Sequence, residues 1–338
     1  MLRTHAFRKN SQIHTVSRRS VIVGMGSAAF AGGVKAQTAW PERAVRFIVP
    51  LGAGSGADFG ARLIGERLQQ FWTKPVVIEN RPGGNGLTAI NAFLTANDSH
   101  TLFYGAAATF TVHPYQMESV PYNFARDILP IAQATVTIAV VAVPASSPVK
   151  TMSEFVRLAR ENPGKMNAAL VPGISEITFD RFVKAEKLEI TKVPYRNIVD
   201  AVADASVGRI QFISSAYAVV QAAVESGAIR VIAVTNSQRF SGLPAIMTCE
   251  EQGVPSMSYE GLAGLFGTAL LSAELRTKIG EDVARAANDP TIKQRIEGTG
   301  QMVSPGGAAV FKNSIEAQME EITKTAEFLG LKAARIAP

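Results

Sequence analysis

Short apolar runs alternate with amphipathic stretches from Trp40 to the end of the chain. Val45–Val49 predicts a strand, and the longer β-branched run Thr135–Val143 predicts a strand buried on both faces. From Asp58 to Phe71, apolar residues recur every three or four positions, which predicts a helix that packs by one face. Strands that alternate with helices are typical of a largely parallel α/β sheet, and this is the fold class that we predict. Further strands are expected over residues 76–78, 101–104, 168–171, 210–213 and 229–234, with mainly helices after residue 267.

Capping residues predict where two of the helices begin. Thr151-Met152-Ser153-Glu154 is a capping box, because its hydroxyl and carboxylate are spaced to satisfy the first free N–H groups of a helix. Asp289-Pro290 places an N-cap residue before a proline, which is favoured at the first helical position. We therefore expect helices to begin after Thr151 and after Asp289.

Composition limits the class of protein. A chain of 338 residues with 47% hydrophobic and 18% charged residues is long enough for two domains and too apolar to be disordered. Its single cysteine, Cys249, excludes an internal disulfide and a thiolate metal cage, and we expect it to be a small buried apolar side chain. No internal repeat is present.

The positive charge belongs to the first 36 residues. They hold six of the 34 basic residues and no acidic one, which leaves 28 basic against 28 acidic residues from position 37 onward. A neutral remainder does not indicate a nucleic-acid-binding face.

Residues 1–36 have the pattern of an export signal. A basic stretch precedes an apolar run over 21–34, too short to span a membrane, and Val34-Lys35-Ala36 is a small-residue cleavage site. Ser17-Arg18-Arg19-Ser20 resembles a twin-arginine signal, and the glycines of the apolar run favour that route over an ordinary secretory signal. Either route predicts a mature protein that begins near Gln37 in the periplasm.

The strongest local feature is the glycine-rich segment from Pro50 to Asp58, between a predicted strand and a predicted helix. Backbone N–H groups of such a loop can face an anion, and the helix dipole adds to the attraction. Three interpretations stay open on spacing alone: a dinucleotide loop, a carboxylate-binding loop, or a tight turn that binds nothing. Glu79 ends the next strand, where a ribose-binding acid would stand, whereas Ala57 breaks the usual glycine pattern of a dinucleotide loop. We expect Asp58 to cap the helix rather than to act in catalysis.

Residues for catalysis or metal binding are scarce. His100 and His113 are the histidines beyond the leader, and no nucleophile elbow or spaced metal-ligand motif accompanies them. We therefore predict no histidine-based catalysis and no metal, and the function that we favour below is not that of an enzyme and needs no cofactor.

Three more predicted strands end in small residues, over 105–109, 171–175 and 214–216. The carboxyl ends of strands in open α/β sheets often converge on one ligand cleft. The candidate ligand-binding residues are accordingly Leu51, Gly52, Ala53, Gly54, Ser55, Gly56, Ala57, Ala107, Ala108, Thr109, Val171, Pro172, Gly173, Ser175, Ser214 and Ser215.

Ordered motifs over nearly the whole mature chain resemble the Bug family, the periplasmic receptors of tripartite tricarboxylate transporters. They include "WPERAVRFIVPLGAGSGADFGARLIGERL" at 40–68, "PVVIENRPGGNG" at 75–86, "TLFYG" at 101–105, "VPYRN" at 193–197 and "SGAIRVIAVTNSQRFSGLPAIMTCEEQGVP" at 226–255. The resemblance also accounts for the segment from Glu79 to Gly83, which the dinucleotide interpretation leaves unexplained.

The resemblance implies a type II periplasmic-binding-protein fold, in which two α/β lobes joined by two crossing strands close on a ligand. The crossings are expected near Ile138–Val143 and Gly261–Phe266, with lobe 1 over 37–137 and 263–338 and lobe 2 over 138–262. The family typically binds small carboxylates through backbone amides, hydroxyls and water, and presents them to membrane permease subunits. We expect a monomer that binds neither nucleic acid nor membrane stably.

Departures from the family pattern concern the ligand. Gly56 and Ala57 replace a hydroxyl residue before the acid, although Ser55 supplies one nearby, and the second loop lacks the usual Asn and His. Ser215 stands where amino-acid-binding members tend to have Asp, which argues against an amino acid as the carried solute. Glu176 and Asp180 are either solvated helix acids or groups that select an amine or hydroxyls. An exported NAD(P)-dependent oxidoreductase that uses the 52–56 loop is the alternative function, and a sensor that reuses the receptor fold is a third.

Overall fold

A computed structural model describes residues 40–170, 173–195 and 198–336. The chain divides into two units, Met1–Trp40 and Pro41–Pro338, and the fold reported below is that of the second unit. The predicted export signal, with the predicted twin-arginine motif and the predicted cleavage site before Gln37, lies outside the described residues.

The first of two large sheets has six strands in the order β12-β5-β11-β3-β1-β2. β1, β2 and β3 are parallel, whereas β11 runs antiparallel to both β3 and β5, and β12 runs antiparallel to β5. The central strands β1, β3, β5 and β11 are largely buried on both faces, whereas the edge strands β2 and β12 are partly exposed. The strands are β1 (Val45–Val49), β2 (Val76–Asn80), β3 (Thr101–Ala106), β5 (Leu129–Thr137), β11 (Gly261–Gly267) and β12 (Gln301–Gly307).

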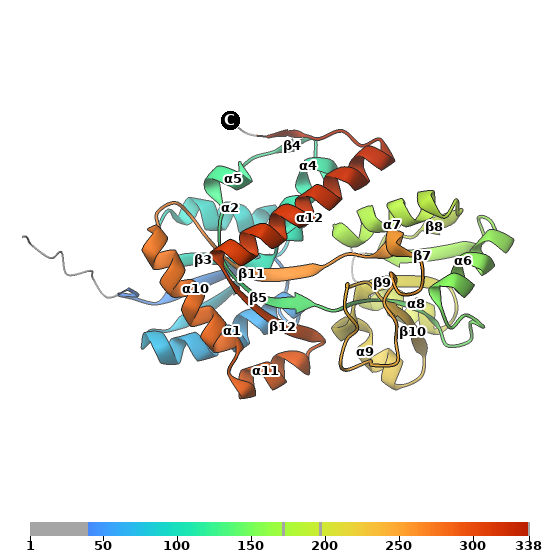
Figure 1. Cartoon of the computed structure of the whole chain (residues 1–338), viewed down its shortest axis with the longest axis horizontal. Coiled ribbons are helices and arrows are strands. Elements are labelled where there is room, and N and C mark those ends of the chain that lie inside the picture. Colours follow the sequence, from blue (N-terminus) through green and yellow to red (C-terminus); the bar gives the residue numbers. More distant parts are fainter. Residues whose placement is uncertain (1–39, 171–172, 196–197, 337–338) are drawn as a thin grey trace, which may run out of the picture. The chain divides into compact units, whose positions relative to one another are not determined.

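Two groups of helices cover this sheet (Figure 1). Helices α1, α10 and α11 pack together as one group. Helices α2 and α12 form the second group, and both contact strands of this sheet. Their bounds are α1 (Gly56–Trp72), α2 (Leu87–Ala96), α10 (Ala273–Ala287), α11 (Pro290–Glu297) and α12 (Ala308–Leu329). The helix predicted from Asp58 to Phe71 is confirmed as α1.

The second sheet has five strands in the order β10-β6-β9-β7-β8. Its core lies on both faces, with α6 and α7 over one apolar cluster and α8 and α9 over another. The elements are β6 (Ala139–Pro144), β7 (Met166–Leu170), β8 (Ile190–Lys192), β9 (Phe212–Ala216), β10 (Ile229–Val234), α6 (Met152–Glu161), α7 (Ile174–Ala185), α8 (Ile198–Ser206) and α9 (Tyr217–Glu225).

The chain passes between the two sheets twice, at Ile138 and in the short segment between Met257, which packs in the core of the second sheet, and β11. The prediction of two α/β lobes joined by two crossings is therefore confirmed. The single strand predicted over Thr135–Val143 is wrong in detail. The run is divided at Ile138 into β5 and β6, because these two strands belong to different sheets. The Ile138 N–H donates to the Gly300 carbonyl. The exact lobe limits stay predictions, and the one at 262/263 falls inside β11.

Short elements complete the described chain. β4 and β13 pair in parallel near its end, and α3 and α4 follow β3. Their bounds are η1 (Gly84–Gly86), α3 (Ala108–Thr111), α4 (His113–Gln116), β4 (Ser119–Val120), α5 (Phe124–Asp127), η2 (Pro255–Met257) and β13 (Arg335–Ile336).

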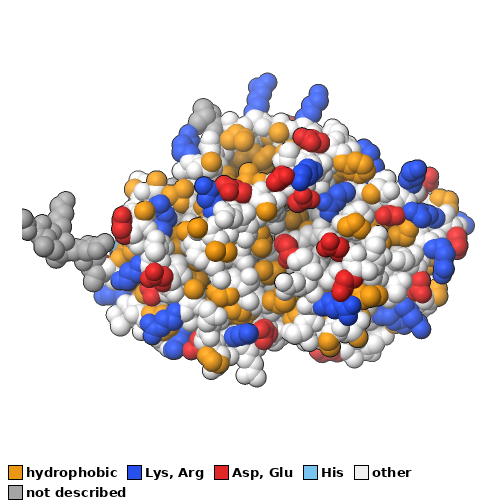
Figure 2. Space-filling view, viewed as in Figure 1, with side chains coloured by type: hydrophobic (Ala, Val, Ile, Leu, Met, Phe, Trp, Pro, Cys, Tyr) orange, Lys and Arg blue, Asp and Glu red, His pale blue; other side chains and the backbone are white. Residues whose placement is uncertain are grey.

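The distribution of charged side chains on the surface and the burial of Cys249 agree with what the composition predicts. On the face in Figure 2, basic and acidic side chains are interspersed rather than segregated. Cys249 is buried, as predicted, and burial raises the pKa of its thiol to about 12. Among the helices that the structure describes, none combines the length and apolarity that a bilayer span requires.

Candidate functional site

The glycine-rich segment turns the chain from β1 into α1. The Ser55 N–H donates to the Gly52 carbonyl at 3.2 Å, and Gly54 adopts a φ of +85°, a conformation that favours glycine. The Ser55 side chain is the N-cap of α1, because its hydroxyl accepts from the Asp58 N–H at 3.3 Å. The capping role that we predicted for Asp58 therefore belongs to Ser55.

Asp58 holds the turn from inside. The residue is only 2% exposed, and its carboxylate accepts from the Gly54 N–H at 2.9 Å, from Arg62 Nε at 3.0 Å and from Asn80 Nδ2 at 3.0 Å. Asn80 also donates to the Leu51 carbonyl at 2.9 Å. Asn80, the last residue of β2, thus fixes both ends of the turn, a role that sequence reasoning did not find.

These bonds determine which amides are left for a ligand. The Gly54 N–H is taken by Asp58, whereas the N–H groups of Gly56 and Ala57 have no partner among the described residues. Both lie in the first turn of α1, a helix of 17 residues, where the dipole attracts anions. The carbonyl of Gly56 accepts from Gln301 Nε2 at 2.9 Å, and this bond holds the peptide group between Gly56 and Ala57 in place. The turn is therefore a rigid, neutral cradle for an anion.

The charge of Asp58 makes this turn sensitive to pH. Burial alone would raise the pKa of Asp58, but hydrogen bonds from Arg62, Gly54 and Asn80 outweigh it and lower the pKa below the ordinary 3.8. The unfolded chain then binds a proton before the folded chain does, so this stabilisation is present above pH 3.8 and is lost as pH falls through the folded pKa.

We expect Asp58→Asn to be less stable than wild type near neutral pH. A neutral amide accepts hydrogen bonds from Gly54, Arg62 and Asn80 less strongly than a carboxylate does. The deficit should shrink as pH falls from about 5 to about 3, since wild type then loses the same charge. Urea unfolding of both proteins at each pH measures it. A deficit that stays constant with pH would contradict the assigned charge of Asp58.

Thr109 lies near the glycine-rich turn of residues 51–57, which is called the first turn from here on. A Cβ built on Gly86 would stand 2.6 Å from Thr109 Cγ2 and 3.6 Å from Pro50 Cβ, so both side chains lie next to Gly86. Ala107 and Ala108 are buried, and the Ala107 N–H already donates to the Leu262 carbonyl at 2.8 Å. Of this predicted segment, the half-buried Thr109 is the member with a side chain placed to reach a ligand at the turn.

The predicted segments of the other lobe are placed differently. Gly173 is the N-cap of α7, and its carbonyl accepts from Gln116 Nε2 of the first lobe at 3.1 Å. Ser175 is buried in the first turn of α7. Val171 and Pro172 lie outside the described residues.

Ser214 and Ser215 are shielded from solvent, at 0% and 2% exposed. The Ser214 hydroxyl lies 3.4 Å from the Tyr259 hydroxyl, and the Ser215 Oγ is buried with no partner in the part of the chain that the structure describes. The structure therefore brings the first turn and Thr109 together and links Gly173 to their lobe. It places the two serines in the interior of the second sheet.

Two residues that support the site escaped sequence reasoning. Gln301 joins the Gly56 carbonyl to β5, because its Oε1 also accepts from the Thr135 hydroxyl at 3.0 Å. His113 donates from Nε2 to the Asn85 carbonyl and accepts at Nδ1 from the Tyr122 hydroxyl, so its neutral ring fixes the turn beside Thr109. Burial lowers the pKa of His113, consistent with a structural role.

The residues suggested for other chemistries are occupied. Glu79 pairs with Arg46 and Arg81 instead of standing free for a ribose. Glu176 and Asp180 are half exposed and both pair with Lys192. Within residues 40–170, 173–195 and 198–336, no group of three or more His, Cys, Asp or Glu side chains could hold a metal ion.

Comparison with known proteins agrees with this geometry. The family model described as "Tripartite tricarboxylate transporter family receptor" matches residues 61–324. The UPF0065 protein in the tcbD-tcbE intergenic region of Pseudomonas sp. (strain P51) is 25% identical over 322 residues, covering 94% of this chain and 96% of that protein.

Solved structures show the same fold. A periplasmic transporter superposes with a TM-score of 0.77 at 26% identity, covering 87% of this chain and 99% of that one. R. palustris Rpa4515 with adipate superposes with a TM-score of 0.76 at 24% identity and the same coverage. The type II periplasmic-binding-protein fold and the resemblance to the receptor family are thereby confirmed, and the oxidoreductase alternative finds no support.

Proposed function

Because this chain belongs to the tripartite tricarboxylate transporter family receptors, we propose that it captures one small carboxylate in the periplasm and delivers it to membrane permease subunits. The protein is a solute-binding receptor and not an enzyme. The mature form is proposed to begin near Gln37 and to act as a monomer whose lobes divide at 137/138 and 262/263.

The observation that carries this proposal is the pair of unpartnered N–H groups of Gly56 and Ala57. They stand at the positive end of α1, in a turn that Asp58, Asn80 and Gln301 hold rigid. Rigid neutral donors bind a carboxylate without the desolvation cost of a buried ion pair. Such a site can also release its ligand, as delivery requires.

We place one ligand carboxylate on the first turn, formed by Leu51, Gly52, Ala53, Gly54, Ser55, Gly56 and Ala57, with the Thr109 hydroxyl beside it. Val171, Pro172, Gly173 and Ser175 are proposed to reach the ligand from the second lobe when the lobes close. Ala107, Ala108, Ser214 and Ser215 are proposed to shape the cleft through packing, because they are buried. Closure of the two lobes then marks the loaded receptor for the permease.

Adipate is named with one structural neighbour, which makes dicarboxylates the first class to test. A thermal-shift screen of the purified full-length chain would compare adipate, malate, citrate and benzoate with NAD⁺ and NADP⁺. A ligand at about 100 times its Kd adds about 2.7 kcal/mol of stability, which moves the Tm by several degrees. We expect a shift with one carboxylate class and none with the nucleotides. A shift with a nucleotide alone would overturn the proposal.

A further inference from the structure

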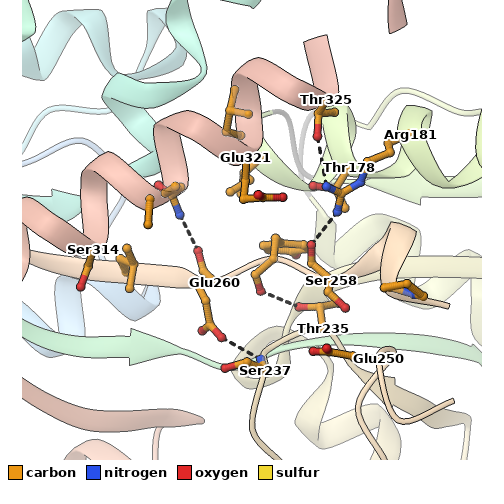
Figure 3. Close-up of a pocket in the computed structure, with 17 residues that line it drawn as sticks. Thr178, Arg181, Thr235, Ser237, Glu250, Ser258, Glu260, Ser314, Glu321 and Thr325 are labelled. Atoms are coloured by element: carbon orange, nitrogen blue, oxygen red, sulfur yellow. Dashed lines mark hydrogen bonds between the residues drawn. The ribbon is translucent and has the colours of Figure 1, made fainter. Parts of the chain in front are cut away.

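A cavity of about 490 Å³ lies between α7, α12 and the segment that precedes β11 (Figure 3). None of the residues proposed for carboxylate capture lines it. Its walls come from both lobes. Helix α7 and residues 255–259 pack against the second sheet, whereas Leu262 and α12 belong to the lobe of the first sheet. The volume is within the range of small-molecule sites.

Arg181 brings a positive charge to this cavity, and the acid that acts on it, Glu321 of α12, lies farther away than an ion pair. Its Nε donates to the Ser256 carbonyl at 2.8 Å, Nη2 to the Ser258 carbonyl at 2.8 Å, and Nη1 to the Thr325 hydroxyl at 3.1 Å. These acceptors are neutral, and among the described residues Arg181 forms no ion pair within 4.0 Å. A guanidinium has five N–H groups, so two remain for a ligand anion.

Burial makes this arrangement unusual. Arg181 is half-buried beside the fully buried Thr178 and Thr325, and burial lowers the pKa of the guanidinium. Desolvating a charge that has no ion-pair partner in contact is costly, and a ligand carboxylate on the two remaining N–H groups would supply that contact.

The acidic side chains of the cavity lie nearer to solvent. Glu321 of α12 is 62% exposed and pairs with Lys324 at 3.1 Å, and Glu250 is exposed as well. The third acid, Glu260, is occupied by the Ser237 N–H at 2.7 Å and by Asn236 at 2.9 Å. Positive charge inside and negative charge toward solvent match a ligand that carries both charges.

Apolar surface completes the lining. Ile174 of α7 and Ile322 of α12 face the cavity from opposite lobes and belong to one apolar cluster. Tyr259 and Leu262 contribute further apolar surface between them. Such walls favour a ligand with an apolar body over a purely ionic one.

We propose that this cavity binds an apolar L-α-amino acid, with its carboxylate on Arg181, its ammonium group toward Glu321 and its side chain against Ile174, Tyr259 and Ile322. The site goes beyond the proposed capture of a carboxylate by the first turn. Because both lobes line it, an occupant stabilises one arrangement of the lobes and thereby changes the affinity of the first turn for its carboxylate.

The test is isothermal titration of the purified full-length chain with L-leucine and L-phenylalanine. Two analogues of leucine each lack one of its charges. 4-Methylpentanoate has no ammonium group, and 3-methylbutylamine has no carboxylate. We expect at least one amino acid to bind, and each analogue to bind at least about tenfold more weakly at this cavity.

Variants locate the binding. Ala317→Trp fills the cavity from the exposed face of α12 and should weaken amino-acid binding at least about tenfold, whereas Ala309→Trp, on the same helix outside the cavity, should not. Glu321→Gln, a change at an exposed position that leaves the core untouched, should weaken leucine several-fold without affecting 4-methylpentanoate.

Ser55→Asp separates this cavity from the first turn. It should leave amino-acid binding unchanged, because Ser55 is not part of the cavity. Three results would overturn the proposal: no binding by either amino acid, unchanged affinity in Ala317→Trp, or loss of amino-acid binding in Ser55→Asp. The last would assign the amino acid to the first turn, and none of the three affects the proposed capture of a carboxylate there.

Discussion

Replacement of Ser55 by Asp is expected to weaken carboxylate binding at least about tenfold, or about 1.4 kcal/mol, with the fold intact. Ser55 caps α1 by accepting from the Asp58 N–H, and Asp caps a helix as well as Ser does. The new carboxylate, however, would stand beside the N–H groups of Gly56 and Ala57. It would compete for them and repel a bound anion, and two like charges about 4 Å apart near a surface interact by about 4 kcal/mol.

Ser55→Asn is the matched control, since Asn is also a good N-cap and carries no charge. Titration with adipate, or with whichever carboxylate shifts the Tm in the screen, gives the Kd of wild type and both variants. Melting curves without ligand verify that all three are folded. Equal affinities of the Asp and Asn variants would contradict a carboxylate site at this turn.

Local signals in the sequence predicted local structure well. The helix predicted after Thr151 forms, with the Thr151 hydroxyl accepting from the Glu154 N–H at 3.2 Å, although the Glu154 carboxylate accepts from the Lys150 N–H rather than from that of Thr151. Asp289 caps α11 through two N–H groups. The turn from β1 into α1 is local too, because a strand, a run of glycines and an amphipathic helix follow one another directly. In each case the interacting atoms lie within a few residues, where spacing determines contact.

Contacts between distant segments could not be predicted in this way. Gln301 reaches Gly56 across 245 positions, and no pattern near either residue indicates the pair. Asn80 lies in a motif that sequence reasoning singled out, but its role depends on β2 lying beside β1, which only the sheet order provides. The cavity around Arg181 likewise needs α7, α12 and the segment before β11 together.

The sequence did not indicate the burial of two candidate ligand-binding residues. Ser214 and Ser215 are polar residues at a strand end, which is typical of ligand loops, yet both are buried. β9 lies between β6 and β7, so its last residues are still covered by neighbouring strands. Similarly, Asp58 was assigned the cap because an acid suits a helix start, whereas the geometry gives that position to Ser55.

Gly264→Ala is expected to destabilise the protein by about 3 kcal/mol or more and to lower its Tm by several degrees. Gly264 lies in β11, between β3 and β5, where the register with β5 shifts. A Cβ at this position would stand 2.1 Å from the Ala132 carbonyl oxygen and 2.7 Å from Phe311 Cε1. The oxygen belongs to the backbone of the adjacent strand, so relief requires the strands to separate rather than a side chain to rotate.

Gly52→Ala is the control for this substitution, because a Cβ there has no heavy atom within 4 Å and the backbone conformation is ordinary for any residue. Thermal melts of both variants without ligand, followed by circular dichroism, measure the difference. We expect Gly52→Ala to melt close to wild type and Gly264→Ala well below it. Since β11 carries the chain from the second crossing into the first sheet, the loss should appear as cooperative unfolding of that lobe rather than as fraying. A Gly264→Ala protein that melts with wild type would mean that β11 and β5 lie farther apart than this register requires.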